Sequence, residues 1–286
     1  RQTWNAAFFP AGDVLLLFVV VGVVLFLTRS WSDRAIGVAA VVLLLQPVEW
    51  YHYIANLINP AHRLPDLKVA EMYGEVADYT KAGNWRDFLL GNVTLGQKAS
   101  FLWAVNAGRF VQTAGLFLLG FFIGRKQLFM TNEKNIVFWT KVLIISAISF
   151  APLYTLKELV MENDPIVQQT VGTAFDMWQK LAFTLVLVAS FILLYQHKNF
   201  SKAVAGLRFY GKMSLTNYIS QSIIGAFIYF PIGLNLAPYC GYTLSLSVGF
   251  LIFLLQLKFC KWWLARHKQG PLEYIWHKCT WIGTGK

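Results

Sequence analysis

Charged residues are scarce in this sequence. Only 14% of its 286 residues are Asp, Glu, Lys or Arg, whereas 56% are hydrophobic and the mean hydropathy is +0.49. A soluble globule of this size needs more charge to cover its surface. The composition therefore excludes a soluble protein and indicates an integral membrane protein, whose first partner is the lipid bilayer.

Cysteine is also scarce, and several chemical motifs are missing. There are three cysteines and no CxxC pair, so the sequence has no zinc or thiol-redox signature and predicts no metal site. Cys240 is expected outside the membrane and Cys260 and Cys279 at its cytoplasmic face, which excludes a disulfide from Cys240 to either of the others. Neither a P-loop nor a GxSxG elbow occurs, and no cofactor is evident.

Long apolar runs dominate what is present. Seven runs come close to the ~20 residues that cross ~30 Å of hydrocarbon. They are residues 13–28, 35–58, 101–123, 137–154, 177–196, 213–230 and 242–263. The sequence thus predicts an all-α, polytopic transmembrane helix bundle of about seven spans, which we treat as one domain, 1–286.

The net charge of +11 follows the loops between these runs. Lys and Arg are not clustered on one soluble face, so the excess predicts no nucleic-acid partner. They fall in alternate connections: Arg29, Arg34; Arg125, Lys126, Lys134; Lys198, Lys202, Arg208, Lys212; and Arg266, Lys268, Lys278, Lys286. The positive-inside rule then puts the C-terminus in the cytoplasm.

Two stretches outside the runs have a predicted structure of their own. Residues 59–100 form the longest connection, expected outside the membrane and partly helical, either as a soluble cap or as a helix lying in the interface. After Gly270, Pro271 and an acidic first turn predict a short amphipathic helix on the cytoplasmic surface.

Ionisable and polar residues at membrane depth are the first candidates for a site, because they cost several kcal/mol unless they are paired. Glu49 and Arg109 are expected at nearly the same depth, ~21 Å from the inner side and ~12 Å from the outer side. The candidate substrate-binding residues of this outer half are Glu49, His52, Asn106, Arg109 and Gln112. The alternatives are a buried ion pair between Glu49 and Arg109 that fixes helix packing, and an interfacial hydrogen-bonding role for His52.

A second polar stripe opens the sixth run. Its members share one helical face at i, i+3, i+4 and i+7. They are Ser214, Asn217, Tyr218 and Gln221. The stripe either lines a cavity open to the cytoplasm or holds helices together.

The same stretch carries a family resemblance. Residues 211–221 (GKMSLTNYISQ) and 270–276 (GPLEYIW) resemble the paired signature of the YeiB-like bacterial membrane protein family, a domain of unknown function (418). Residues 12–15 (GDVL) and 118–125 (LLGFFIGR) are similar to its pattern too, and 211–286 is the signature region. The upstream helices of that family are not matched and the chain begins with Arg1, so we expect the N-terminal part to be missing.

The resemblance implies one function, and the residues leave others open. The family is distantly similar to transmembrane acyltransferases, which implies transfer of an acyl group, with acyl-CoA as the possible donor, to an envelope lipid or glycan acceptor at the bacterial inner membrane. The polar groups at membrane depth would serve equally in a transporter of a small polar or anionic solute. A membrane scaffold without catalytic activity is the third hypothesis. Transport would require broken helices or inverted repeats, which the sequence does not reveal.

Overall fold

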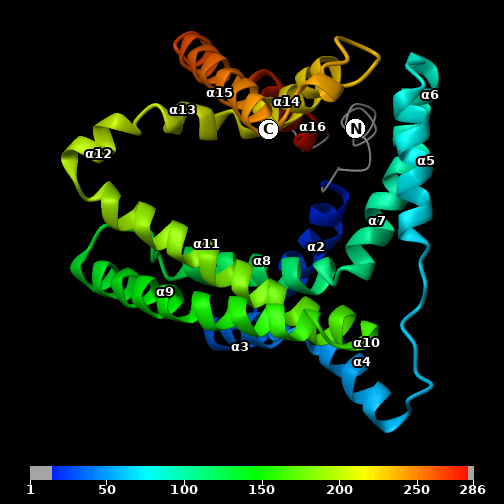
Figure 1. Ribbon diagram of the computed structural model, residues 1–286. Helices are drawn as coiled ribbons and strands as arrows, with labels where there is room; N and C mark the ends of the chain where they lie inside the picture. The colour runs from blue at the N-terminus through cyan, green and yellow to red at the C-terminus, as the bar shows by residue number, and fades with distance from the viewer. Residues whose placement is uncertain (1–14, 283–286) are drawn as a thin grey trace. The chain divides into compact units, whose positions relative to one another are not determined.

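The computed structural model describes residues 15–282, and this part of the chain is helical without a strand (Figure 1). The prediction of an all-α fold is confirmed. The helices are α2 (Leu15–Thr28), α3 (Asp33–Leu44), α4 (Pro47–Ile58), α5 (Val69–Lys81), α6 (Trp85–Gly91), η1 (Asn92–Gly96), α7 (Gln97–Asn106), α8 (Arg109–Arg125), α9 (Glu133–Met161), α10 (Pro165–Val167), η2 (Gln168–Gly172), α11 (Thr173–Tyr195), α12 (Lys198–Ala203), α13 (Leu207–Lys212), α14 (Ser214–Tyr229), η3 (Ala237–Tyr239), α15 (Tyr242–Leu264) and α16 (Pro271–Thr280).

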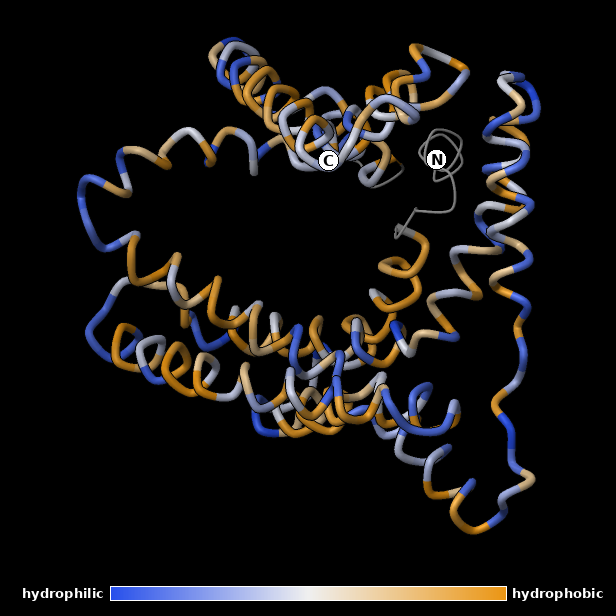
Figure 2. The backbone as a smooth tube through the Cα atoms, viewed as in Figure 1, coloured by the Kyte–Doolittle hydropathy of each residue, from blue (hydrophilic) through white to orange (hydrophobic). Residues whose placement is uncertain are grey.

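Among the described residues, three continuous helices are long and apolar enough to cross a membrane. They are α9, the stretch Pro165–Tyr195 and α15, and Figure 2 shows hydrophobic residues along their length. Two bent pairs, α3 with α4 and Trp85–Asn106 with α8, raise the number to five if each pair is one span. The protein is therefore a membrane protein with three to five candidate spans, and the expected seven are not confirmed.

The difference arises because two expected spans are broken. The run 35–58 bends by 47° between α3 and α4, and the run 101–123 is interrupted between α7 and α8, where the bend is 76°. The residue before a proline disfavours the α conformation, so Pro47 ends α3. The first and sixth runs give α2 and α14, which at 14 and 16 residues are short for a span.

The chain divides into two compact units, each described here by itself. The described part of unit 1 is 70–99 and 199–282, and that of unit 2 is 15–69 and 100–198. The motif 12–15 lies outside the described residues except for Leu15. A single transmembrane domain stays a prediction.

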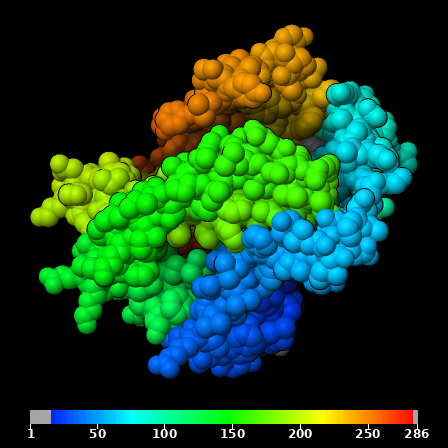
Figure 3. Space-filling model, turned by 60° about the horizontal axis from the view of Figure 1, so that its bottom comes forward, coloured from blue at the N-terminus to red at the C-terminus, as the bar shows by residue number. Residues whose placement is uncertain are grey.

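Unit 2 is built on two helix pairs. The helix α11 lies along α9, as Figures 1 and 3 both show, and α8 packs on α3 and α2. Ile36 and Ala40 of α3 are buried against Leu118 of α8. At one end of this pair Asp33 accepts from Arg125 at 3.2 Å and from Lys126 at 2.8 Å. Two loops that the charge pattern predicts on the same side of the membrane thus meet.

Unit 1 joins part of the 59–100 stretch to the C-terminal region. The stretch is partly helical as expected, with α6 buried at Phe88 against Ala226 and Ile232. Its position outside the membrane, and that of α16 on the cytoplasmic surface, stay predictions.

Candidate functional site

The break between α3 and α4 leaves polar groups buried in unit 2. Gln46 adopts a left-handed conformation with φ 59°, which is uncommon for a residue other than glycine. Its side chain is only 1% exposed, and neither Nε2 nor Oε1 has a hydrogen-bond partner. A buried amide without partners costs free energy, typically 1–3 kcal/mol for each unsatisfied group. The side-chain amide of Gln46 is therefore available to hydrogen-bond a ligand at the break.

A tryptophan from α11 secures this break. The main-chain carbonyl of Leu44 accepts a hydrogen bond from Trp178 Nε1 at 2.8 Å. The indole of Trp178 also stacks on Trp50 of α4, with 6.1 Å between ring centroids. Because the bend frees carbonyls at the end of α3, Trp178 supplies a donor that an unbroken helix would not need.

The break between α7 and α8 lies against the first one. Gly108 has φ 61°, and a Cβ on it would collide with Oε1 of Glu49 and touch Met177 Cε at 3.5 Å. Only glycine combines this backbone conformation with room for the carboxylate. The side chain of Glu49, a residue that is 5% exposed, thus lies against Gly108, the N-cap residue of α8.

Arg109 begins α8 and follows Gly108 directly in the chain. Its Nη1 donates to Gln112 Oε1 at 2.8 Å, and its guanidinium lies 5.5 Å from the centre of the Trp103 ring. Its Nε is buried without a partner. In the described part of unit 2 no ion pair joins Arg109 to Glu49. The carboxylate of Glu49 lies against Gly108, the residue before Arg109, and the expected pair is not formed.

We use the name junction for the residues at these two breaks, Gln46, Glu49, Gly108, Arg109 and Gln112. The partial positive charge at a helix start favours Glu49, which is in the first turn of α4 and against the start of α8. The same dipole disfavours Arg109. An anion bound at Arg109 would compensate the unfavourable interaction between its charge and the helix dipole, and a cation could bind the carboxylate of Glu49. The junction is suited to a small ligand that carries charges of both signs.

The helix α4 leads from the junction to a polar pocket of about 550 Å³. This outer pocket is lined by Asn56, Pro60, Arg63, Leu64, Asp164, Pro165, Ile166 and Gln169. Asn56 lies two turns beyond Glu49 on the same helix face, ~10 Å along the axis. Between them, His52 Nδ1 and His62 Nε2 are 3.1 Å apart, and Asn56 Nδ2 donates to the carbonyl of His62 at 3.1 Å.

The expected site residues of the outer half therefore separate into three groups. Glu49, Arg109 and Gln112 come together at the junction. His52 makes a hydrogen bond on the way to the outer pocket. Asn106 is exposed at the end of α7 and joins neither.

The polar stripe of α14 is mostly occupied by neighbours within unit 1. Asn217 is buried and donates to the carbonyl of Tyr210 at 3.0 Å, with Cys260 Sγ at 3.3 Å. Gln221 Nε2 donates to Tyr210 Oη at 2.6 Å and to Gln256 Oε1 at 2.9 Å. Ser214 is exposed and Tyr218 half-buried. These bonds join α13, α14 and α15 and favour helix packing as the role of Asn217 and Gln221.

The second half of the signature caps α14. Its N-cap position is Met213, which makes no side-chain capping bond. Glu273 supplies the capping bonds instead. Its Oε1 accepts a hydrogen bond from the main-chain N–H of Thr216 at 3.0 Å, and its Oε2 accepts one from Thr216 Oγ1 at 2.5 Å. A Cβ on Gly270 would collide with Glu273 Oε2, so glycine leaves room for the carboxylate.

The two signature segments are thus in contact in the structure. A comparison with known families matches a region that includes both of them. Residues 123–283, more than half of the chain, match the family described as "Protein of unknown function (DUF418)". The chain belongs to the DUF418 family. This confirms the YeiB-like resemblance, whereas the similarity to acyltransferases is not part of the match.

Two curated relatives are similar to shorter stretches of this DUF418 protein. One, "Uncharacterized protein YxaH" of Bacillus subtilis (strain 168), is 25% identical over 33% of this chain and 24% of its own length. The other, "Uncharacterized 39.9 kDa protein in amylase 3'region" of Bacillus acidopullulyticus, is 37% identical over 31% of this chain and 25% of its own length. The chain thus matches about a quarter of each relative. No solved structure matches.

The DUF418 match includes the capped α14 but stops short of the junction. All five junction residues precede position 123. The polar pattern of the sequence predicted Glu49, Arg109 and Gln112 as site residues but did not indicate Gln46 or Gly108. Pro47 was the available signal for the first, because it predicts a break at the residue before it.

Proposed function

We propose that this DUF418 protein transports a small zwitterionic solute, bearing an anionic and a cationic group, across the bacterial inner membrane. The observation that carries the proposal is the junction, where two broken helices leave buried polar atoms of Gln46 and Arg109 without hydrogen-bond partners. Interrupted helices with buried polar groups are typical of substrate sites in transporters. No such break was predicted from the sequence, and its presence favours transport.

The charges of the outer pocket support the same class of solute. The junction offers one guanidinium, one carboxylate and two amides, from Arg109, Glu49, Gln46 and Gln112. The outer pocket offers the same groups from Arg63, Asp164, Asn56 and Gln169. Asp164 makes no side-chain capping bond although it holds the N-cap position of α10. A solute that satisfies one set of groups therefore satisfies the other, and α4 connects the two.

The test is binding and uptake by the full chain in lipid. Calorimetry in nanodiscs would use L-alanine and L-glutamine, their methyl esters, which lack the carboxylate, and the corresponding amines. We expect at least one zwitterion to bind at least ten-fold more tightly than its ester and its amine. The same solute should accumulate in proteoliposomes.

Two variants and a control assign the site. Arg109→Gln and Glu49→Gln should each weaken binding of the zwitterion at least ten-fold, because each removes the partner of one charge. Arg29→Gln makes the same change at an exposed arginine outside the junction and should bind as the wild type does. Equal binding by Arg109→Gln, Glu49→Gln and the wild type would refute the proposal.

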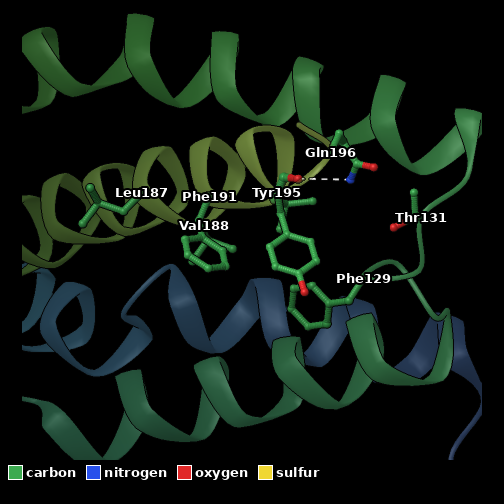
Figure 4. A pocket seen from close by; sticks show the side chains of 8 residues that line it. Phe129, Thr131, Leu187, Val188, Phe191, Tyr195 and Gln196 are labelled. Carbon is green, nitrogen blue, oxygen red and sulfur yellow. Dashed lines mark hydrogen bonds between the residues drawn. The ribbon is translucent and has the colours of Figure 1, made fainter. Parts of the chain in front are cut away.

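A second candidate, acyl transfer, is favoured by an apolar pocket of about 520 Å³ in unit 2 (Figure 4). Its wall is formed by Leu187, Val188, Phe191 and Ile192 of α11 with Phe129, and Thr131, Tyr195 and Gln196 add polar groups. Such a pocket suits the acyl chain of an acyl-CoA donor. Glu49 would take the proton of an acceptor hydroxyl, whose oxygen then attacks the thioester carbonyl; the C–S bond breaks and CoA leaves as the thiol with that proton.

One measurement separates the two candidates. Proteoliposomes given acyl-CoA and a lipid or glycan acceptor would release free thiol under acyl transfer, and that release would stop in Glu49→Gln. Under transport, uptake of the zwitterion proceeds without acyl-CoA and no thiol appears. Absence of both activities would leave the scaffold hypothesis.

A further inference from the structure

A third pocket, in unit 1, is strongly basic. It has a volume of about 430 Å³ and lies where α13 and the segment after α15 come together. Its lining residues are Phe209, Lys212, Leu264, Ala265, Arg266, His267 and Lys268. Three of these seven side chains are cationic, one is histidine, and none is acidic.

Neighbouring tryptophans hold two of these basic groups. The guanidinium of Arg266 lies 5.0 Å from the centre of the Trp262 ring, and the ring of His267 stacks on Trp263 at 4.1 Å. By contrast, the ammonium groups of Lys212 and Lys268 have no hydrogen bond or ion pair within the described chain. Cations gathered around one pocket repel one another unless an anion lies between them.

The pocket lies at the end of an apolar helix. The helix α15 is one of the candidate spans, and the pocket begins at its last residue, Leu264. Trp262 and Trp263 lie just before it, and tryptophans of this kind gather at the level of the lipid headgroups. The loop charges predict that this end faces the cytoplasm. The pocket is thus placed where lipid phosphates lie, with Phe209 and Leu264 as apolar contacts.

We propose that this pocket binds a phosphate ester, and specifically the headgroup phosphate of an anionic lipid such as phosphatidylglycerol. Basic pockets near the cytoplasmic ends of membrane helices bind anionic headgroups in this way. Loop cations that serve only membrane topology would not need to line a common pocket free of acidic groups. The proposal is independent of the solute site in unit 2.

Native mass spectrometry of the full chain would test this. Protein released from nanodiscs that contain equal phosphatidylglycerol and phosphatidylcholine should retain the first lipid selectively. Lys212→Gln with Lys268→Gln should lower the retained fraction at least five-fold. The control, Lys202→Gln with Lys278→Gln, makes the same charge change on α12 and α16 of the same unit and should lower it less than two-fold.

Two further arms identify the source of the phosphate. Glycerol 3-phosphate and inorganic phosphate, each added at millimolar concentration, should not displace the lipid if the headgroup is bound together with its chains. Displacement by either one would assign the pocket to a soluble phosphate and overturn the lipid assignment. Equal retention of both lipids, or equal loss in the two double variants, would overturn the pocket itself.

Discussion

Replacing Glu273 by alanine should destabilise unit 1 by about 2 to 3 kcal/mol. A side-chain cap contributes ~1 kcal/mol to a helix. A hydrogen bond to a charged group contributes about 1.5–3 kcal/mol. Glu273 makes one bond of each kind to Thr216, at 3.0 Å and 2.5 Å, and the two share one carboxylate, so their sum is an upper limit. The helix α14 has no cap of its own to replace it.

Thermal melting of the full chain in detergent would measure the effect. At about 2 to 4 °C per kcal/mol for a chain of this size, the midpoint should fall by about 5 to 10 °C. Glu133→Ala is the matched control, because Glu133 is also an acid in the first turn of a helix but is exposed; its loss should lower the midpoint by about 2 °C.

A double-mutant cycle decides whether the bonds themselves matter. Thr216→Val removes the hydroxyl but keeps the main-chain N–H, so combined with Glu273→Ala it should cost clearly less than the sum of the two single changes. A midpoint for Glu273→Ala within 1 °C of the wild type, or additive losses in the cycle, would show that the carboxylate does not cap α14.

Three other predictions follow from particular residues. Gly108→Ala should lower the folded yield sharply, because the new Cβ collides with Glu49 and because alanine would have to adopt φ 61°. A normal yield would contradict the described junction. Burial raises the pKa of Tyr79 to about 12, so the folded state holds the phenol proton more tightly than the unfolded chain does. The stability of the fold should therefore decrease as the pH rises from about 10 to 12. Melting at alkaline pH should show a smaller decrease for Tyr79→Phe. Reporter fusions after Lys202 should indicate the cytoplasm and fusions after Glu162 the outside; the reverse would contradict the loop-charge topology.

The sequence predicted the parts of this fold that depend on local composition. Apolar runs gave the helical membrane class, and the loop charges placed Asp33 and Arg125 on the same side, where the structure joins them. The depth estimates put Glu49 and Arg109 at the same level, and the structure places Glu49 against Gly108, the residue before Arg109.

The parts that it could not predict depend on distant contacts or on backbone conformation. Glu273 reaches Thr216 across 57 positions, and helical periodicity relates only residues on the same helix. The pattern selected Ser214 for the stripe, whereas the bond to Glu273 is made by its neighbour Thr216. Gly108 resembles any glycine in an apolar run, and only the position of Glu49 shows why a side chain is excluded there.

Gln46 adds a physical argument for a ligand at the junction. A left-handed conformation outside glycine costs about 1–3 kcal/mol, and glycine at this position would avoid it. A buried amide without partners costs as much again, and an apolar side chain would avoid that. The chain has neither replacement and bears both costs at one residue, which is 1% exposed and lies three positions before Glu49. An amide offers a donor group, its NH2, and an acceptor group, its carbonyl oxygen, and a zwitterionic solute would require one group of each kind there.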